Sequence, residues 1–393
     1  MRLTYVTRSF LDYRIPVLEE LHRSLDGQFN FIYSADYVPE RCHQRLQNSL
    51  GPAAIGLRGE RRIGPNETAG FANRTLRIVY QPGLIRHIGE TAPDVLVGDG
   101  FFQWTGAALW YRATRRVGLV VTYERTFHTE RHAQKVRTLY RKAVMRWVDA
   151  MAVNGELSKE YSIFLGMDGN KITTGQMTAD SHVLAEQAAA VTDAQKFEIR
   201  QAWGSPDVAM VTVGRLNDRK GITELLNGWH LLEKNRPGNW RLIIIGDGPN
   251  RAALENQVSE KGLNGVIFAG HVDYNNIAPF YAAADVLVMP TLEDNWSLVV
   301  PEAMACSLPI LCSIYNGCFP ELIEEDSNGW TFDPHDAQDT EARLAHCIEQ
   351  RNKLPSFGER SREIVSTQTP ARAADAIIGA AQIAISGTRK DQA

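Results

Sequence analysis

The chain has 393 residues, of which 44% are hydrophobic and 22% charged, and it carries a net charge of −4. This length suits two domains that each bury a core, and the composition excludes a disordered or low-complexity protein. The negative net charge argues against nucleic acid as the main partner.

Short apolar runs alternate with helical patterns through the first half of the chain. Because helices separate these runs, we expect them to be parallel strands. The predicted strands are Leu3–Thr7, Phe29–Tyr33, Val95–Val97, Leu119–Tyr123, Ala150–Asn154 and Lys171–Thr174. The first one begins so close to Met1 that we expect no signal peptide.

The stretch Pro52–Ala72 has no hydrophobic period. Glycine, proline, arginine and asparagine are scattered through it. This composition predicts a mobile loop over the ligand cleft, with no strand of its own.

Residues 112–146 are strongly basic, with ten Lys or Arg against two Glu. Within 131–147 the apolar residues recur at helical spacing, which predicts an amphipathic helix. These apolar residues are Val136, Leu139, Tyr140, Ala143, Val144 and Trp147. One interpretation is that the apolar stripe faces the core and the basic residues are solvated. The other is that the helix docks on the anionic headgroups of a membrane surface.

The alternation of strands and helices is clearer in the second half. The predicted strands are Ala209–Val213, Arg241–Gly246, Gly265–Ala269, Asp285–Pro290, Pro309–Ser313 and Gly329–Phe332. Ser181–Ser205 is polar and without a strand signal, so it is predicted to be a linker leading into a helix, with the domain boundary near Val183. The fold class is therefore α/β, with two Rossmann-like doubly wound domains. Such domains are expected to face each other across a deep cleft at the carboxyl ends of their strands.

The segment 213–221 follows a predicted strand and precedes a helix. Gly214 allows a tight turn of the backbone, and Arg215 and Lys220 project beyond the strand. Arg binds phosphate through two parallel hydrogen bonds and Lys as a point charge, so the pair suits a diphosphate. The two cations would stabilise a departing nucleoside diphosphate without a metal ion. The alternative is a pair of surface cations.

The segment 245–249 ends the next predicted strand with two glycines, Gly246 and Gly248. They permit close approach of a ligand, or they serve only a tight turn between strand and helix. Taken alone, the turn is the better interpretation.

In the segment 290–306 a strand ends in an acidic loop, and a helix is predicted to open near Ser297. The free N–H groups at the helix start are expected to bind phosphate, and they belong to Ser297, Leu298 and Val299. Glu302, about one turn further on, is placed to accept hydrogen bonds from ribose hydroxyls. Glu293 or Asp294 is expected to hold hydroxyls of a donor sugar. The alternative for each carboxylate is charge complementarity at a helix start.

In order and spacing these three segments resemble the retaining GT-B glycosyltransferases of family 4, group 1, which build bacterial polysaccharides, glycolipids and sucrose. The matching residues are Gly214-Arg215-Leu216 with Lys220-Gly221, then Gly246 to Pro249, then Asp294 followed after seven residues by Glu302. The resemblance implies that Arg215 and Lys220 grip the diphosphate, that Glu302 holds the ribose, and that the backbone around Val266–Val272 holds the base. The other donor-binding residues that it implies are Phe268, His271, Val272 and Trp296.

The resemblance also implies the reaction: retaining transfer from a nucleotide diphosphate sugar, by preference a UDP-sugar, to a saccharide or lipid-linked acceptor. Asp294 stands where the family has Glu, so the donor-sugar contact is open between Glu293 and Asp294. Ser297 and Ser307 each replace a glycine, and Asn316-Gly317 stands where two glycines are common.

The N-terminal half resembles the family less, as expected of a domain that holds the acceptor. Arg14 lies in a Tyr-Arg-x-Pro sequence found in some relatives and is expected to reach the acceptor side of the cleft. Relatives place a histidine near the donor sugar after the fourth strand, so His128 is the catalytic candidate, with His132 second and Arg125 beside the acceptor. The predicted domains are 1–183 for the acceptor, 184–368 for the nucleotide sugar, and 369–393 for a helix that crosses back to the first domain.

The sequence predicts no cofactor and no metal site. Its cysteines lack the CxxC spacing of zinc sites, and they are Cys42, Cys306, Cys312, Cys318 and Cys347. Together with the absence of a run of roughly 20 apolar residues, this predicts a cytoplasmic protein, peripheral at the inner face of the membrane if the basic helix docks there. Two other functions stay open: a non-catalytic regulatory subunit that binds sugar nucleotides, and a sugar-nucleotide epimerase. Nucleic-acid binding lacks a recognition motif.

Overall fold

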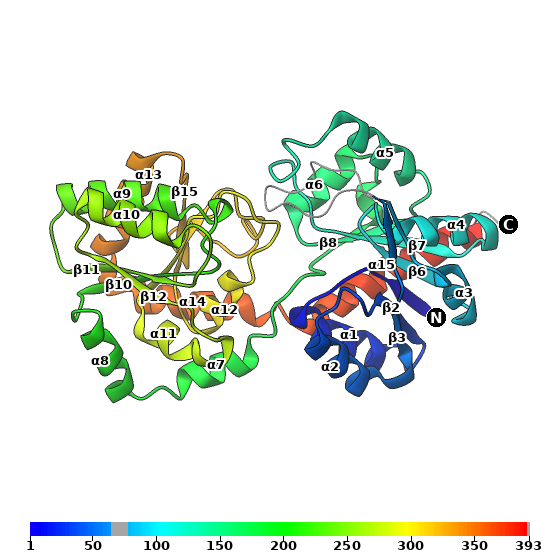
Figure 1. Ribbon diagram of the computed structural model, residues 1–393, viewed down its shortest axis with the longest axis horizontal. Helices are drawn as coiled ribbons and strands as arrows, with labels where there is room; N and C mark the ends of the chain where they lie inside the picture. Colours follow the sequence, from blue (N-terminus) through cyan, green and yellow to red (C-terminus); the bar gives the residue numbers. More distant parts are fainter. Residues whose placement is uncertain (64–77, 391–393) are drawn as a thin grey trace. The chain divides into compact units, whose positions relative to one another are not determined.

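The computed structural model describes residues 1–63 and 78–390. They form two compact units: unit 1 is Met1–Thr178 with the C-terminal segment from Thr369, and unit 2 is Ala179–Gln368 (Figure 1). The chain therefore enters unit 2 just after Thr178, whereas the boundary predicted near Val183 lies inside a helix.

Unit 1 is built on a sheet of seven parallel strands in the order β3-β2-β1-β6-β7-β8-β9. The strands are β1 (Leu3–Val6), β2 (Phe29–Ser34), β3 (Ala54–Leu57), β6 (Val95–Asp99), β7 (Gly118–Tyr123), β8 (Ala150–Val153) and β9 (Ile172–Thr174). β1 is an inner strand of the sheet, where Leu3 pairs with Phe29 on one side and Val95 on the other. Helices cover both faces, which is why these strands read as continuous apolar runs.

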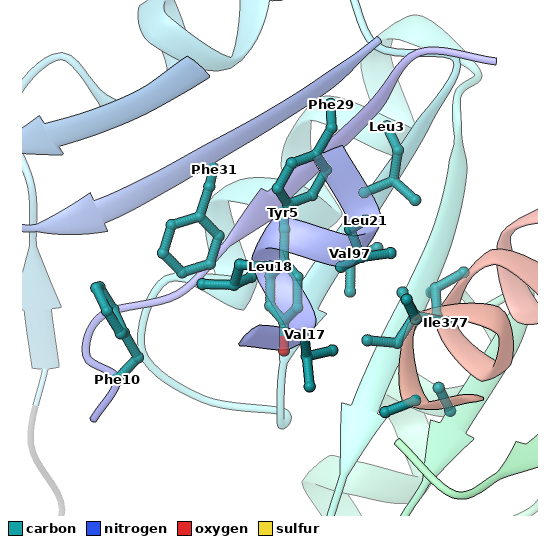
Figure 2. Packing of buried hydrophobic residues seen from close by; sticks show 14 of the residues in the cluster. Leu3, Tyr5, Phe10, Val17, Leu18, Leu21, Phe29, Phe31, Val97 and Ile377 are labelled. Atoms are coloured by element: carbon teal, nitrogen blue, oxygen red, sulfur yellow. The ribbon is translucent and has the colours of Figure 1, made fainter. Parts of the chain in front are cut away.

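The helices of unit 1 lie on both faces of the sheet. Their bounds are α1 (Ile15–Ser24), α2 (Glu40–Leu50), α3 (Leu84–Glu90), α4 (Thr105–Arg115), α5 (Lys135–Met145), α6 (Glu156–Phe164) and α15 (Pro370–Lys390), with short 3-10 helices at Asp12–Arg14, Gly51–Ala53 and Gly169–Lys171. Figure 2 shows Val17 and Leu18 of α1 and Ile377 of α15 gathered around Tyr5 and Phe31 of the central strands. The last helix of the chain thus completes the core of unit 1.

Unit 2 has six parallel strands in the order β12-β11-β10-β13-β14-β15. They are β10 (Val208–Val213), β11 (Trp240–Ile245), β12 (Val266–Gly270), β13 (Val286–Met289), β14 (Ile310–Ser313) and β15 (Gly329–Phe332). Side chains of α9 (Ile222–Asn235), α10 (Arg251–Lys261) and α13 (Ala337–Glu349) share one buried cluster with the sheet. Figure 1 shows α7 (His182–Ala189), α8 (Asp193–Ala202), α11 (Ala278–Ala283) and α12 (Val299–Ala305) on the opposite side. The remaining helices are α14 (Leu354–Ser366) and 3-10 turns at Asp218–Lys220, Tyr274–Asn276 and Arg351–Lys353.

The twelve strands predicted from the sequence are all present, with ends that shift by at most two residues. The predictions for two other segments were wrong. The predicted linker 181–205 is instead the two helices α7 and α8, and the second begins with a capping box between Thr192 and Gln195. Within Pro52–Ala72, where no strand was predicted, β3 pairs with β2, and β4 (Arg61–Ile63) pairs antiparallel with β5 (Ile78–Tyr80). Residues 64–72 of that stretch lie outside the described residues.

The basic segment forms a helix, α5, but the apolar stripe predicted for it does not face the core. α5 begins at Lys135, and Val136 and Leu139 are 67% and 66% exposed, whereas Arg137 and Arg141 are buried. Arg141 pairs with the buried Glu130 at 2.7 Å. Because this carboxylate is buried beneath the helix, a guanidinium group must turn inward to neutralise it. The core-facing interpretation of the stripe is therefore wrong.

None of the helices in the two described ranges has both the length and the apolar character that a bilayer-spanning segment requires.

Candidate functional site

The first two motif loops of unit 2 pack directly on each other, because they leave neighbouring strands. Gly214 follows β10 and donates its N–H to the carbonyl of Ile245 at 3.0 Å, and Leu216 donates to the carbonyl of Asp247 at 3.0 Å. A Cβ atom on Gly246 would lie 1.9 Å from the carbonyl oxygen of Gly214. The contact between the loops therefore requires a glycine at 246.

Gly221 fixes the acidic loop against the cationic one. Its φ of 66° lies in the left-handed region, and a Cβ atom there would lie 1.9 Å from the carbonyl oxygen of Pro290. Next to this contact, Leu292 donates its N–H to the carbonyl of Arg219 at 2.8 Å. The loop after β13 is thereby held beside the loop after β10.

A pocket lies at the carboxyl end of β10. It is lined by Thr212, Val213, Gly214, Arg215, Leu216, Lys220, Ile222 and Met289. Arg215 is exposed and, within the part of the chain that the structure describes, makes no hydrogen bond or ion pair. The structure thus brings the two predicted diphosphate cations, Arg215 and Lys220, to one pocket.

Lys220 is held by one of the two carboxylates that the sequence left open. Its Nζ donates to Oδ2 of Asp294 at 2.9 Å. Oδ1 of Asp294 accepts a hydrogen bond from the N–H of Trp296 at 3.2 Å, and the backbone carbonyl of Asp294 accepts one from the N–H of Gly317 at 3.0 Å. Glu293 is buried. Asp294 is therefore the carboxylate that forms an ion pair with Lys220 of the pocket.

The acidic loop and the loop after β14 bury several polar atoms that have no hydrogen-bond partner among the described residues. They are Oδ1 of Asn295, Nε1 of Trp296, Oγ of Ser297 and Nδ2 of Asn316. A buried polar group without a partner costs about 1–3 kcal/mol, so such a group calls for an explanation. Four of them in one loop region suit a site that is completed by a polar ligand.

The helix after this loop begins later than the sequence suggested. α12 starts at Val299, with Leu298 as its N-cap, and no side chain caps it. The N–H of Ser297, predicted to be free for phosphate, points instead to Oδ1 of Asn316 at 3.4 Å. The side chain of Asn316 supplies a hydrogen-bond acceptor that a glycine at this position would lack. This role was not predicted from the sequence, where Asn316 was noted only because it replaces the first glycine of Gly-Gly.

Glu302 lies in the first turn of α12, and burial raises the pKa of its carboxyl to about 8. Burial and the nearby Glu302 charge raise the pKa values of Tyr274, Tyr281 and Cys306, so these side chains lie close to Glu302. The hydroxyl of Tyr281 is buried and has no partner among the described residues. Tyr274 was not singled out from the sequence, because a tyrosine in a polar turn carries no motif.

The predicted base-binding residues lie on and after β12. Phe268 and Val272 are half-buried, and His271 is exposed. Phe268 lies within β12 and packs against the core cluster of unit 2, whereas His271 and Val272 follow that strand. The placement of His271 and Val272 agrees with a ligand lying along the carboxyl ends of β10, β11 and β12.

The candidate residues of unit 1 do not form one group. Arg14 pairs with Glu124 at 2.5 Å and donates to the hydroxyl of Tyr5 at 3.0 Å, and its role on the acceptor side stays a prediction. Arg125 lies 3.6 Å from Glu130. The carbonyl of His128 accepts a hydrogen bond from Arg131 at 2.6 Å, and His132 is exposed. The roles of both histidines stay predictions.

Within the described residues, no three His, Cys, Asp or Glu side chains lie together in a group suited to a metal ion.

The family match lies within unit 2. Residues 195–364 match the family model described as glycosyl transferases group 1. Over 173 residues the chain is 33% identical to sulfoquinovosyl transferase SQD2 of Arabidopsis thaliana, a match that covers 43% of this chain and 32% of that protein. Over 191 residues it is 29% identical to alpha-monoglucosyldiacylglycerol synthase of Acholeplasma laidlawii, covering 48% of this chain and 45% of that protein. The chain thus spans less than half the length of these relatives.

The fold is shared over nearly the whole chain. The crystal structure of Anabaena HepE in complex with UDP matches with a TM-score of 0.73 at 17% identity, and covers 96% of this chain and 98% of that chain. The two Rossmann-like units of this chain are therefore those of a GT-B fold.

Proposed function

We propose that this chain, which carries a glycosyl transferase group 1 domain over residues 195–364, transfers a sugar from a nucleotide diphosphate sugar to an acceptor hydroxyl. The observation that carries the proposal is the pocket at the end of β10, which holds Arg215 and Lys220 together. Two cations at the carboxyl edge of a doubly wound sheet suit the two phosphates of such a donor.

The chemistry of transfer is charge stabilisation on the leaving group. As the glycosidic bond opens, negative charge develops on the diphosphate, and Arg215 and Lys220 stabilise it. In a retaining reaction the incoming hydroxyl and the leaving phosphate share one face of the sugar, so a phosphate oxygen takes the proton. Neither a metal ion nor a dedicated carboxylate base is then needed. Product anomers identified by NMR, with the reaction run in EDTA, test retention and metal independence separately.

UDP is the proposed nucleotide. The support is that HepE, which shares the fold, was solved in complex with UDP and with UDP-glucose. In this chain the ribose would lie at Glu302, and the base at the strand end formed by Phe268, His271 and Val272.

Asp294 is the proposed contact of the donor sugar. The support is its position beside Lys220, at 2.9 Å. When a diphosphate engages Lys220, the Asp294 carboxylate is released from the ion pair and can accept hydrogen bonds from sugar hydroxyls. The buried donors at Trp296 and Asn316 supply complementary groups in the same loop region.

A saccharide or glycolipid acceptor is proposed for unit 1, supported by two relatives whose names denote glycolipid synthesis or sulfoquinovosyl transfer. Arg125, His128 and His132 are the residues to vary there. A regulatory subunit without turnover and an epimerase are the competing functions. Steady release of nucleotide diphosphate, with a new glycosidic bond in the product, excludes both.

A specific observation favours attachment to an anionic membrane surface. The outward face of α5 carries Val136, Leu139 and Tyr140, and Trp147 is exposed just after it. Basic side chains flank this face at Lys135, Lys142 and Arg146. Such a combination of apolar and cationic side chains is complementary to the interface of an anionic bilayer. Cosedimentation with vesicles that contain phosphatidylglycerol, compared with pure phosphatidylcholine vesicles, tests it.

A further inference from the structure

The loops after β13 and β14 contain four buried polar side-chain atoms that lack a hydrogen-bond partner in the described part of the chain. The atoms belong to Asn295, Trp296 and Ser297 after β13 and to Asn316 after β14. We call these four residues the loop cluster. The strand order β12-β11-β10-β13-β14 places the cluster beyond the pocket at the end of β10. A donor with its base at β12 and its diphosphate at β10 would therefore carry its sugar towards the loop cluster.

Backbone contacts hold the two loops of the cluster together. Asp294 and Asn316 form an isolated parallel β-bridge, and Gly317 donates its N–H to the carbonyl of Asp294 at 3.0 Å. A Cβ atom on Gly317 would lie 1.9 Å from the carbonyl oxygen of Asn295, so the loops touch at this point. Lys220 of the pocket reaches the same loop through its ion pair with Asp294 at 2.9 Å. The loop cluster is therefore one group of residues that adjoins the proposed diphosphate site.

The amide of Asn316 has a fixed orientation. Asn316 is 0% exposed, and its Oδ1 accepts the N–H of Ser297 at 3.4 Å and the N–H of Cys318 at 3.3 Å. Because two backbone donors hold the oxygen, the nitrogen of this amide is the group that stays open. Nδ2 of Asn316 has no partner within the two described ranges.

The open atoms of the loop cluster require a ligand group that both accepts and donates hydrogen bonds. Nδ2 of Asn316 and Nε1 of Trp296 are donors, Oδ1 of Asn295 is an acceptor, and Oγ of Ser297 can be either. None of these four side chains is charged. A carboxylate or sulfonate would add negative charge beside Asp294 and would leave Oδ1 of Asn295 without a donor. The group that completes the cluster is therefore neutral.

We propose that the donor sugar carries an acetamido group that the loop cluster binds. The carbonyl oxygen of this group accepts from Nδ2 of Asn316 and Nε1 of Trp296, and its N–H donates to Oδ1 of Asn295. A single hydroxyl oxygen would have to lie within hydrogen-bond distance of all three residues at once, whereas an acetamido group divides the contacts between two atoms. This inference rests on the proposed function, since it names the chemical class of the donor sugar.

Calorimetric titration of the full chain with nucleotide sugars tests the inference. UDP-N-acetylglucosamine is compared with UDP-glucose, and UDP-N-acetylgalactosamine with UDP-galactose, so that each pair differs only in the acetamido group. We expect at least one acetamido donor to bind about tenfold more tightly than its hexose counterpart. The ratio of the two affinities is the measured quantity, because the contribution of the diphosphate cancels in it.

Asn316→Asp keeps the oxygen that accepts from Ser297 and Cys318 but replaces the N–H donor, so it should abolish the preference for the acetamido donor. Asn295→Ala removes the acceptor for the acetamido N–H and should lower the preference as well. Asn352→Asp, at an exposed asparagine of the 3-10 helix Arg351–Lys353, is the matched control and should leave the ratio unchanged.

Three results would overturn the inference: equal affinity for acetamido and hexose donors, tighter binding of UDP-glucuronate than of either acetamido donor, or an unchanged ratio in Asn316→Asp. UDP alone is titrated into the same samples, which also shows whether each variant is folded. A wild type that binds UDP without a preference for the acetamido group would overturn this inference only. A wild type that binds neither UDP nor any of these donors would overturn the proposed function with it.

Discussion

Nζ of Lys220 donates to Oδ2 of Asp294 at 2.9 Å, so a cation expected to bind phosphate is already engaged by a carboxylate. The two side chains are 23% and 21% exposed, which leaves both within reach of a ligand. Asp294 therefore competes with a diphosphate for Lys220. Arg215 has no such competitor among the described residues.

Replacing Asp294 with Asn should raise the affinity for UDP by about two- to fivefold, because a partly exposed ion pair no longer has to be broken. Isothermal titration calorimetry measures this directly. Glu198→Gln, at an exposed glutamate of α8, is the matched control, and its UDP affinity should stay near that of the wild type. Weaker UDP binding by Asp294→Asn would show that Asp294 positions Lys220 rather than competing for it.

Gly221→Ala should destabilise the protein far more than Gly262→Ala. Both glycines are left-handed, with φ of 66° and 63°, so both variants carry about 1–2 kcal/mol of backbone strain. A Cβ at 221 would in addition lie 1.9 Å from the carbonyl oxygen of Pro290, whereas nothing lies within 4 Å of one at 262. This clash should add about 1–3 kcal/mol and displace the acidic loop. Urea unfolding and UDP titration of the two variants measure both effects, and equal losses would argue against the loop contact.

Glu302 should make unit 2 less stable as the pH rises towards 8. Burial raises the pKa of this carboxyl from 4.5 to about 8, so over that range the folded state binds more protons than the unfolded state. Stability then falls with rising pH and levels off above about pH 8. Glu302→Gln removes this titration, and its melting temperature should fall less than that of the wild type between about pH 5 and about pH 8. Parallel curves for the two proteins would contradict the assignment.

The exposed face of α5 should govern binding to anionic vesicles. Leu139→Ser removes a side chain that is 66% exposed, and we expect about a tenfold loss of binding to phosphatidylglycerol vesicles, with no loss of stability. Phe197→Ser is the matched control, because Phe197 is a similarly exposed apolar residue on α8 of unit 2. Cosedimentation at increasing salt measures both variants. An equal loss in the two variants, or binding by the wild type to neutral vesicles at the same strength, would exclude the docking face.

The sequence predicted twelve of the thirteen strands of the two parallel sheets, because a parallel strand covered on both faces is a continuous apolar run with turn signals at its ends. β3 escaped prediction, since Ala54–Leu57 contains a glycine and only two strongly apolar side chains. The sequence also did not predict which face of α5 is buried. The burial of Arg141 depends on a tertiary contact with Glu130, and periodicity alone does not reveal such a partner.

The two cations of the candidate donor site could be predicted from the sequence. Arg215 and Lys220 were expected at one strand end, and they line one pocket. It was not predictable that Asp294 rather than Glu293 pairs with Lys220, because the sequence does not reveal the backbone angles that set the directions of adjacent loop side chains. The engagement of Arg14 by Glu124 was missed for a related reason, since 110 positions separate the two residues.

The central claim is tested most directly by turnover of a panel of UDP-sugars in EDTA by the wild type and by Lys220→Ala. We predict that the wild type releases UDP from at least one donor, and that Lys220→Ala lowers kcat by about 100- to 1,000-fold while its melting temperature is unchanged. Near-normal turnover by Lys220→Ala, or UDP release only when a divalent metal ion is supplied, would contradict the account.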